Sequence, residues 1–297
     1  MTVTPAVTNN TPYYQDDEYL SLSEYKNAPT AIDYDNLVVG GTQAQQDAEL
    51  LTVIGRASSW INTHLNQSLI ARTMTEQKRT RMTPQGNLII RPETNPVVAF
   101  NSLSYGATPT NLTVVNDLTP LWFEDDKVIY PIAQTSLSYS SQGPLAFGFP
   151  PSSRSQIYVN YSYTCGYVDT TGSGTAGAST VTVTDATAIL PGQILNFYDG
   201  QYSERLKVAS NYTYGSTTVP VTTALAYTHT NAVFSGMPGA VKEAAILVVT
   251  DFLKVRGDNS MTMAVTTRPS SGPSVETLIG SDLAMAKELL RPFRKVR

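Results

Sequence analysis

One stretch constrains the fold more than any other: the segment from Met237 to Gly257, MPGAVKEAAILVVTDFLKVRG, which carries a strong helix pattern. Pro238 suits the first turn of a helix, where its missing N–H costs nothing, and Gly257 suits a left-handed residue that ends one. Apolar residues form two adjacent faces, Val241, Ala245, Val248, Phe252 and Val255 on one and Ile246, Val249 and Leu253 on the other, leaving Lys242, Glu243, Asp251 and Lys254 for solvent. Such a helix is either central in its own domain or also packed against a neighbouring subunit, and the pattern leaves both interpretations open.

Three further helices are expected. Ser21 followed by Glu24 is a capping box that opens a short helix before Pro29. A longer helix is predicted over about 42–66, because Thr42 has a capping partner in Gln45 and apolar residues recur at helical spacing behind it. The last helix is predicted over 275–291, capped by the preceding serine and ended by a proline.

Between these helices the hydrophobic period changes to two, which predicts strands. The candidates are separated by Pro, Gly or Asn and span 73–80, 87–91, 97–105, 112–116, 127–131 and 156–165. Behind them, a linker-like TGSGTAGA and five short Thr- and Tyr-rich strands up to Gly236 indicate a small closed or nearly closed β module. Since that module ends directly before the 237–257 helix, we interpret it as an insertion.

Composition narrows the class of protein. The chain has 297 residues, 15% charged side chains and a net charge of −4, which argues against a whole-protein nucleic-acid binder. The lone Cys165 excludes an intrachain disulfide. No apolar run reaches the roughly 20 residues that cross a bilayer, and no secretory signal pattern opens the chain, so we expect no membrane partner. Residues 1–18, rich in Thr, Pro and Asn, are expected to form an extended arm.

Motifs for catalysis, metal binding or cofactor binding are missing from the sequence. There is no HExxH, GxSxG, Walker-type or dinucleotide fingerprint, and the two histidines, His64 and His229, fall in different predicted elements. We therefore expect no enzyme, no catalytic or metal site and no cofactor. One enzymatic alternative stays open, in which Asp125 or Asp126 of an acidic cluster acts on a glycan or phosphate substrate.

Two clusters allow a binding function. Cationic residues on or near neighbouring strands could face phosphates, although alternation on a solvated sheet face is the commoner explanation: Arg72, Lys78, Arg79, Arg81 and Arg91. Tyrosines of the β module could stack on sugars or bases, or could simply pack: Tyr198, Tyr202, Tyr212, Tyr214 and Tyr227. A virion decoration protein that binds carbohydrate or a host surface through this module is the alternative function.

The order of short segments along the chain is more informative than any one motif. They are YLSLSEY at 19–25, WIN at 60–62, the strand from Arg72 to Glu76, GNLIIRP at 86–92 followed by Pro96-Val97, the hairpin over 122–130, the stretch from VNY at 159 to GY at 167, PGAVKEA at 238–244 and LLRPFR at 289–294. This series resembles the head-tail connector, or adaptor, proteins of long-tailed bacteriophages. The resemblance covers roughly 19–167 and 237–297.

The resemblance implies a structural protein of the virion neck, between capsid and tail, made in the host cytoplasm. In that family the subunits form a homo-oligomeric ring, usually a dodecamer, beneath the portal; the ring continues the DNA channel towards the stopper or head-completion protein and the tail. It implies that the helix over 238–256 packs within and between subunits, with contact candidates Val241, Ala245, Ile246, Val249, Phe252 and Leu253. It also implies portal docking by the C-terminal segment, with candidates Leu289, Leu290, Arg291, Phe293, Arg294, Lys295 and Arg297. The channel would lie close to the genomic DNA, and its face, if lined by loop residues such as 258–267, is expected to be polar and not strongly basic.

The expected fold class is therefore α+β: a helical bundle core with a small antiparallel β element, plus an inserted small all-β, barrel-like domain. The expected division is an arm over 1–18, an adaptor core over 19–170 and 237–297, and the insertion over 171–236. The resemblance supplies no role for the insertion.

Overall fold

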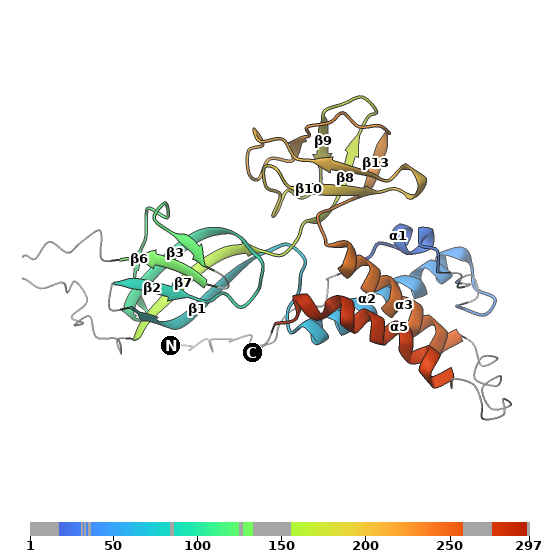
Figure 1. Ribbon diagram of the computed structural model, residues 1–297, viewed down its shortest axis with the longest axis horizontal. Helices are drawn as coiled ribbons and strands as arrows, with labels where there is room; N and C mark the ends of the chain where they lie inside the picture. The colour runs from blue at the N-terminus through green and yellow to red at the C-terminus, as the bar shows by residue number, and fades with distance from the viewer. Residues whose placement is uncertain are drawn as a thin grey trace, which may run out of the picture. The chain divides into compact units, whose positions relative to one another are not determined.

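The computed structural model describes residues 18–30, 32, 34, 37–83, 86–124, 127–132, 156–257 and 275–295 (Figure 1). The predictions for the N-terminal arm, Asp125 and Asp126, the 258–267 loop and Arg297 lie outside these residues. The chain divides into two compact units. The helical unit contains the described residues up to Ser68, the segment Phe197–Glu204 and the residues from Met237 onward, and the sheet unit contains Leu69–Asn196 and Arg205–Gly236.

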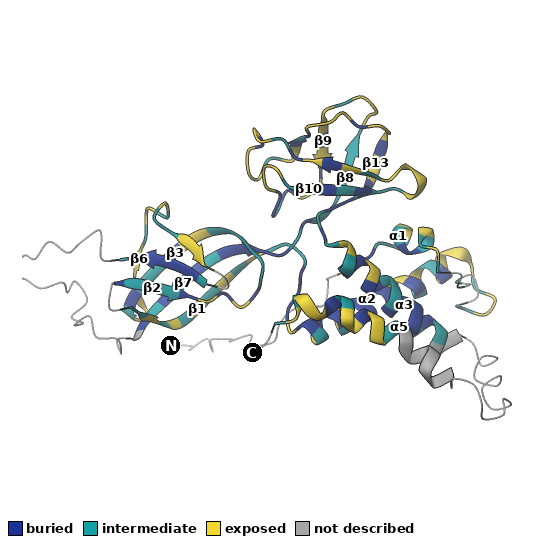
Figure 2. Cartoon of the chain, viewed as in Figure 1, coloured by how far each residue is buried: buried dark blue, intermediate teal, exposed yellow. Residues whose placement is uncertain are grey.

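The helical unit is built around α3 (Gly239–Gly257). This helix packs against α2 (Gln43–Leu65) and α5 (Val275–Leu290), and α1 (Leu22–Asn27) packs against α2. In Figure 2 much of α3 is coloured as buried. Its apolar surface is wide because it packs against two helices of the same chain.

Polar side chains fix where these helices begin and end. Ser21 Oγ accepts the Glu24 N–H at 3.2 Å while Glu24 Oε2 accepts the Ser21 N–H at 2.7 Å, so the predicted capping box is present. Gln45 Oε1 accepts the Thr42 N–H at 2.8 Å at the start of α2. At the end of α2, Asn66 adopts the left-handed conformation with φ of 56°, which stops the helix.

The first sheet of the sheet unit has seven antiparallel strands in the order β4-β3-β7-β1-β2-β6-β5. Their bounds are β1 Arg72–Met82, β2 Asn87–Ile90, β3 Val97–Thr108, β4 Asn111–Val114, β5 Trp122–Glu124, β6 Lys127–Pro131 and β7 Gln156–Cys165. The centre is formed by β7, which pairs with β1 from Arg72↔Cys165 to Arg81↔Gln156 and with β3 on its other side. Strands far apart in the sequence thus meet in one sheet.

One face of this sheet carries its hydrophobic core. The buried residues come from four strands, β2, β3, β6 and β7: Leu88, Ile90, Leu103, Val128, Tyr130, Ile157, Val159, Tyr161, Tyr163 and Cys165. Phe100 stacks on Tyr161 with ring centroids 5.4 Å apart, which adds a directed aromatic contact to the burial. The edge strands β4 and β5 are more exposed and carry apolar side chains at the surface, including Val114 and Phe123.

The second sheet has six strands in the order β11-β10-β13-β8-β9-β12. Their bounds are β8 Asp169–Gly174, β9 Thr180–Val183, β10 Ile194–Tyr198, β11 Glu204–Lys207, β12 Thr218–Pro220 and β13 His229–Ser235. A bridge between Val208 and Val221 joins the residues that follow β11 and β12, the two outer strands. Backbone bonds from Ala209 N to Pro220 O at 2.8 Å and from Thr222 N to Lys207 O at 2.9 Å support it.

The predicted fold class is wrong. Two antiparallel sheets of seven and six strands make up most of the described chain, so a helical bundle core with a small antiparallel β element does not describe it. Most of the individual strands were predicted from the sequence, but the short β5 was not, and most of β8 fell in the stretch interpreted as linker-like. Their joining into one large sheet depends on pairing across long sequence separations, such as β1 with β7, which the two-residue period does not encode.

Candidate functional site

The residues predicted to contact neighbouring subunits occupy two kinds of position on α3. Val241, Ala245, Val249 and Leu253 are at most 3% exposed, so their side chains are enclosed by the chain itself. Ile246 and Phe252 are half-buried. Any contact between subunits through α3 is thus limited to these two and their exposed neighbours, and the intersubunit role stays a prediction.

Three hydrogen bonds attach the predicted portal-docking segment to the end of α2. Lys295 N donates to Leu65 O at 2.9 Å, Asn66 Nδ2 donates to Lys295 O at 3.3 Å, and Gln67 Nε2 donates to Phe293 O at 2.8 Å. The segment includes the short 3₁₀ helix η2 (Arg291–Phe293). The backbone of this terminus is therefore held in a defined conformation.

The side chains of that segment divide into core and surface. Leu290 is fully buried, Leu289, Phe293 and Lys295 are half-buried, and Arg291 and Arg294 are exposed. The pKa of His64, at the end of α2, is lowered by burial and by the nearby charges of Arg294 and Lys287. The C-terminal end of the helical unit is therefore a positively charged surface with a buried leucine anchor.

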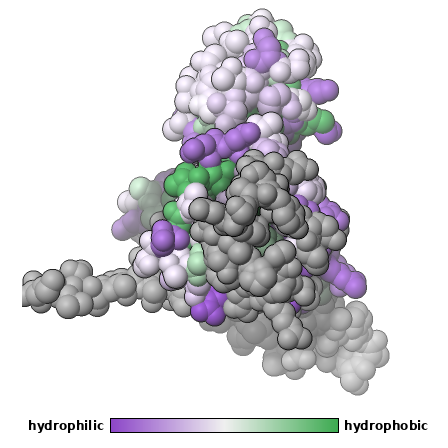
Figure 3. Space-filling model, turned by 90° about the vertical axis from the view of Figure 1, so that its left-hand side faces the viewer, coloured by the Kyte–Doolittle hydropathy of each residue, from purple (hydrophilic) through white to green (hydrophobic). Residues whose placement is uncertain are grey.

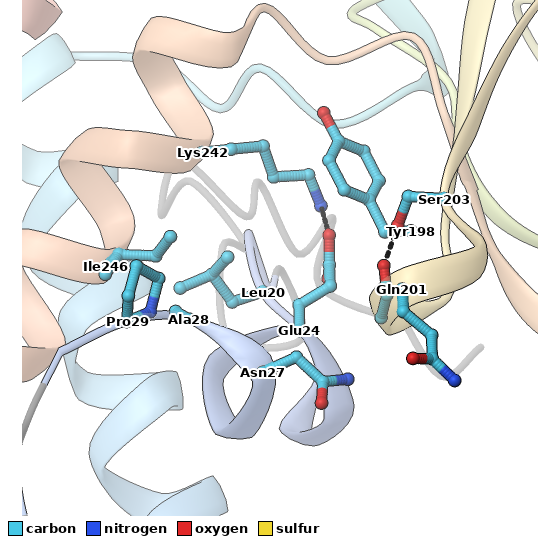
Figure 4. A pocket seen from close by; sticks show the side chains of 11 residues that line it. Leu20, Glu24, Asn27, Ala28, Pro29, Tyr198, Gln201, Ser203, Lys242 and Ile246 are labelled. Carbon is cyan, nitrogen blue, oxygen red and sulfur yellow. Dashed lines mark hydrogen bonds and ion pairs between the residues drawn. The ribbon is translucent and has the colours of Figure 1, made fainter.

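A pocket of about 330 Å³ lies in the helical unit (Figure 4). Its polar side is formed by Glu24 of α1, Lys242 of α3 and residues of the 197–204 segment; its apolar side is formed by Leu20, Ala28, Pro29 and Ile246. Figure 4 shows the Lys242 side chain extending to Glu24 beside the ring of Tyr198. The pocket thus surrounds one buried ion pair.

Lys242 and Glu24 form that pair with 2.9 Å between Nζ and Oε1, and their side chains are 6% and 5% exposed. No hydrogen bond in the described part of the chain reaches Glu24 Oε1, so the attraction is that of two close charges. Tyr198 adds a cation–π contact, with Nζ 5.5 Å from the ring centroid. These contacts link α1, α3 and the 197–204 segment.

This burial corrects a prediction made from the α3 sequence. Of the four charged residues expected to face solvent, Lys242 is only 4% exposed and Asp251 only 6%. Burial, and secondarily the charge of Asp282, raise the pKa of Asp251, while Lys254 opposes the shift. Glu243 is exposed and Lys254 is half-buried, so the prediction is wrong for two of the four charged residues.

A second buried carboxylate, Glu76 of β1, lies on the core face of the seven-stranded sheet. Its oxygens accept hydrogen bonds from Tyr161 Oη at 2.6 Å, from Tyr163 Oη and from the Glu93 N–H at 3.0 Å. Lys78 Nζ is 2.6 Å from Glu76 Oε2 and 3.0 Å from Glu93 Oε1. The cluster replaces the water that a carboxylate would otherwise require.

The electrostatics of the cluster keep Glu76 ionised. Burial by itself disfavours the charged form, but the bonds from Lys78, both tyrosines and the Glu93 N–H outweigh it and hold the pKa of Glu76 below its usual value. The pKa values of Tyr161 and Tyr163 are raised, first by burial and then by the adjacent carboxylate. Neither tyrosine is therefore an acid near neutral pH.

Sequence reasoning did not identify Glu24, Lys242 or Glu76 as members of buried polar clusters. One available signal was a lysine between the apolar residues of AVKEAAIL, and another was a glutamate on the same strand face as methionines. Neither signal can be interpreted until the residue that pairs with the charged side chain is known. Those pairing residues are remote in sequence, and hydrophobic periodicity gives no information about contacts at such separations.

The remaining sequence candidates are placed as follows. Cys165 is buried, and burial raises the pKa of its thiol to about 12, so it is not a nucleophile near neutral pH. His229 is buried at the start of β13, in a different unit from His64. Within the described residues no group of three His, Cys, Asp or Glu side chains could hold a metal ion, and no helix is long and apolar enough to cross a membrane.

The tyrosines of the 171–236 segment do not form one described cluster. Tyr212 is buried and donates to Ser216 O at 2.9 Å, while Tyr198 lines the pocket of the helical unit. Tyr202, in the 3₁₀ helix η1 (Gly200–Tyr202), and Tyr214 and Tyr227 are 43–47% exposed. In Figure 3 the six-stranded sheet, at the top, presents a surface of mostly intermediate hydropathy. Carbohydrate binding through these tyrosines stays a prediction.

Similarity to known proteins is found among solved structures and not among sequences. No family model matches the sequence, and no curated protein matches it. Among solved structures the chain is similar to one titled "Neck of empty GTA particle computed with C6 symmetry", with 14% identity over 95% of both chains and a TM-score of 0.36. A similarity at this level assigns no function to the chain.

Proposed function

We propose that this chain is a non-enzymatic structural protein of a phage-type virion neck, an adaptor whose subunits form a ring beneath the portal and continue the DNA channel towards the stopper and tail. The observation that carries the proposal is the collinear series of segments that resembles the adaptor family. The described parts of these segments lie on or beside elements of the chain from α1 to β7 and from α3 to η2, with the unmatched strands β8 to β13 between them.

Packing explains why the matching segments are short. Tyr19 and Leu20, which precede α1, are buried. Tyr19 N donates to Ser58 Oγ at 3.1 Å and Tyr19 Oη donates to Asn62 Oδ1 at 2.5 Å, so the segment at 19–25 is joined to the WIN segment of α2. Likewise Leu290 of LLRPFR is fully buried. The resemblance thus rests on residues that specify contacts between elements.

The C-terminal surface is the proposed portal contact. Its backbone is held by Leu65, Asn66 and Gln67, while the guanidinium groups of Arg291 and Arg294 are directed to solvent. A fixed backbone lowers the entropy cost of docking, and exposed arginines can form bidentate pairs with carboxylates of a partner. An acidic surface on the portal would complement this terminus.

Electron microscopy of the purified full-length protein mixed with the portal protein encoded beside it tests the proposal. We expect a symmetric ring that caps the portal, and loss of this complex in the Arg291→Glu/Arg294→Glu variant. The matched control, Arg205→Glu/Lys207→Glu, changes charge equally at exposed residues of β11. Deleting α5 is a poorer test because it removes Ala286 and Leu290 from the core. Failure of the wild-type protein to associate with the portal would refute the adaptor function.

A further inference from the structure

The seven-stranded sheet opens between β1 and β2. Strand β1 is paired with β7 along Arg72–Arg81, but it is paired with β2 only at Arg81↔Ile89 and Met82↔Leu88. Beyond this two-residue ladder the strands separate, and a pocket of about 410 Å³ lies at the opening. It is lined by Lys78, Arg79, Thr80, Arg81, Ile89, Ile90, Arg91, Val159 and Tyr161.

The opening brings cationic residues from both faces of the sheet to the lining of one pocket. Lys78 and Arg79 are adjacent in sequence and would point to opposite faces of a closed sheet. Here both line the same pocket, together with Arg81 and Arg91. The interpretation that these residues are spread over a solvated face is therefore incomplete.

Two of these four cations are already engaged. Lys78 contacts the carboxylates of Glu76 and Glu93 and donates to Arg91 O at 3.3 Å. Arg79 Nε donates to Tyr158 Oη at 2.7 Å, and its guanidinium lies over that ring at 4.9 Å from the centroid. Both side chains are thus oriented by protein contacts, as the fixed parts of a binding site would be.

The other two cations face solvent. Arg81 and Arg91 are exposed, and in the part of the chain that the structure describes their guanidinium groups form no hydrogen bond or ion pair. Four cations line the pocket, and Glu76 and Glu93 both contact Lys78. Arg81 and Arg91 therefore add positive charge to the pocket although the whole chain is acidic.

We propose that the pocket between β1 and β2 binds a phosphate group, held by the guanidinium groups of Arg81 and Arg91. Arginine presents a planar set of donors that matches a phosphate in two-point contact. The half-buried Ile89 supplies an apolar contact for the sugar or base attached to it. The phosphate belongs to a nucleic-acid backbone or to a free nucleotide. This inference does not rest on the neck function, because the pocket lies within a single chain.

Binding is measured with the full-length protein and two probes: a fluorescein-labelled 20-base-pair DNA duplex by anisotropy, and ATP by calorimetry, both at low salt. The pocket variant is Arg81→Gln/Arg91→Gln. Its matched control, Arg205→Gln/Lys207→Gln, removes the same charge from exposed residues of β11. For the pocket variant we expect affinity to fall by at least about tenfold and, on DNA, the slope of log K against log salt to become shallower by about 2.

Each outcome decides the proposal. The proposal is supported if the pocket variant loses affinity for a probe that the control variant still binds. The probe that the wild type binds identifies the source of the phosphate: DNA alone, ATP alone, or both if the phosphate group itself is recognised. Binding of neither probe, unchanged binding in the pocket variant, or equal loss in the control overturns it. If the pocket variant melts early, Arg81→Lys/Arg91→Lys keeps the charge but not the two-point geometry, and a partial loss of affinity is expected.

Discussion

A buried carboxylate is stable only where neighbouring groups replace its water, and Glu76 shows how this chain meets that requirement. Its side chain is 8% exposed and accepts bonds from two buried tyrosines while it contacts Lys78. Removing one member of such a cluster leaves the others without partners, which costs more than the bond itself contributes. The stability of the seven-stranded sheet is therefore expected to be sensitive to mutation of this cluster.

We expect Glu76→Ala to lower the free energy of unfolding of the sheet unit by about 3 kcal/mol, because Tyr161, Tyr163 and Lys78 lose their common acceptor. Urea denaturation measures the effect. Glu93→Ala is the control, since the Glu93 side chain is 68% exposed and its loss should cost less than about 1 kcal/mol. Equal costs for the two variants would mean that Glu76 is not the centre of the cluster.

The same residue sets a pH dependence. Because the folded-state pKa of Glu76 is depressed, its contribution to stability is present above the pKa of the unfolded chain and is lost as pH falls through the folded value. We expect wild-type stability to decline faster than that of Glu76→Gln between about pH 5 and pH 3. Parallel curves for the two proteins over that range would contradict the assignment.

In the helical unit, the buried ion pair between Glu24 and Lys242 is expected to be as sensitive to mutation as the Glu76 cluster is in the sheet unit. We expect Lys242→Met to cost about 3 kcal/mol, because it leaves a carboxylate buried among α1, α3 and the 197–204 segment. Adding Glu24→Gln, which keeps an acceptor for the Ser21 N–H, should restore at least about 1 kcal/mol of this loss. A double-mutant cycle in urea checks this, and additive costs would show that the two charges do not interact.

At the scale of elements, short-range signals determine where helices start and stop. The capping box at Ser21 and Glu24 and the left-handed Asn66 satisfy backbone groups at helix ends, and each is determined by residues within one turn. By contrast, the position of the C-terminal segment on α2 depends on bonds across more than 220 residues, such as Gln67 to Phe293. This attachment can be broken without changing either helix.

We expect Gln67→Ala to release the C-terminal segment locally. The bond to Phe293 O is lost, so the Lys295 amide, which donates to Leu65 O, should exchange with solvent at least about fivefold faster, while global stability falls by only about 1 kcal/mol. Amide hydrogen exchange measures the first and urea denaturation the second. A matched Gln43→Ala change at the exposed start of α2 should leave Lys295 exchange unaltered.

At the scale of the whole molecule, the chain forms two compact units, each with its own buried centre. Its two tryptophans are divided between them, Trp60 in α2 and Trp122 in β5. Cys165, the one cysteine, lies in the core of the seven-stranded sheet. Each unit therefore carries a spectroscopic or chemical probe of its own unfolding.

We expect Glu76→Ala to shift the unfolding transition reported by Trp122, in a Trp60→Phe background, to lower urea. The transition reported by Trp60, in a Trp122→Phe background, should not move. Labelling of the Cys165 thiol, which burial keeps protonated, should begin at the lowered midpoint. A single transition that shifts for both tryptophans would mean that the two units unfold together.

Local patterns in the sequence determined the elements of this protein: the helix over 237–257, the capping boxes and most of the strands follow from spacing and cap chemistry within about ten residues. The size of the seven-stranded sheet, the burial of Lys242 and Asp251, and the gathering of Lys78, Arg79, Arg81 and Arg91 at one pocket were decided only by the tertiary structure. The physical reason is that strand pairing and charge burial depend on partners remote in sequence, whereas periodicity reports only which side of an element is apolar.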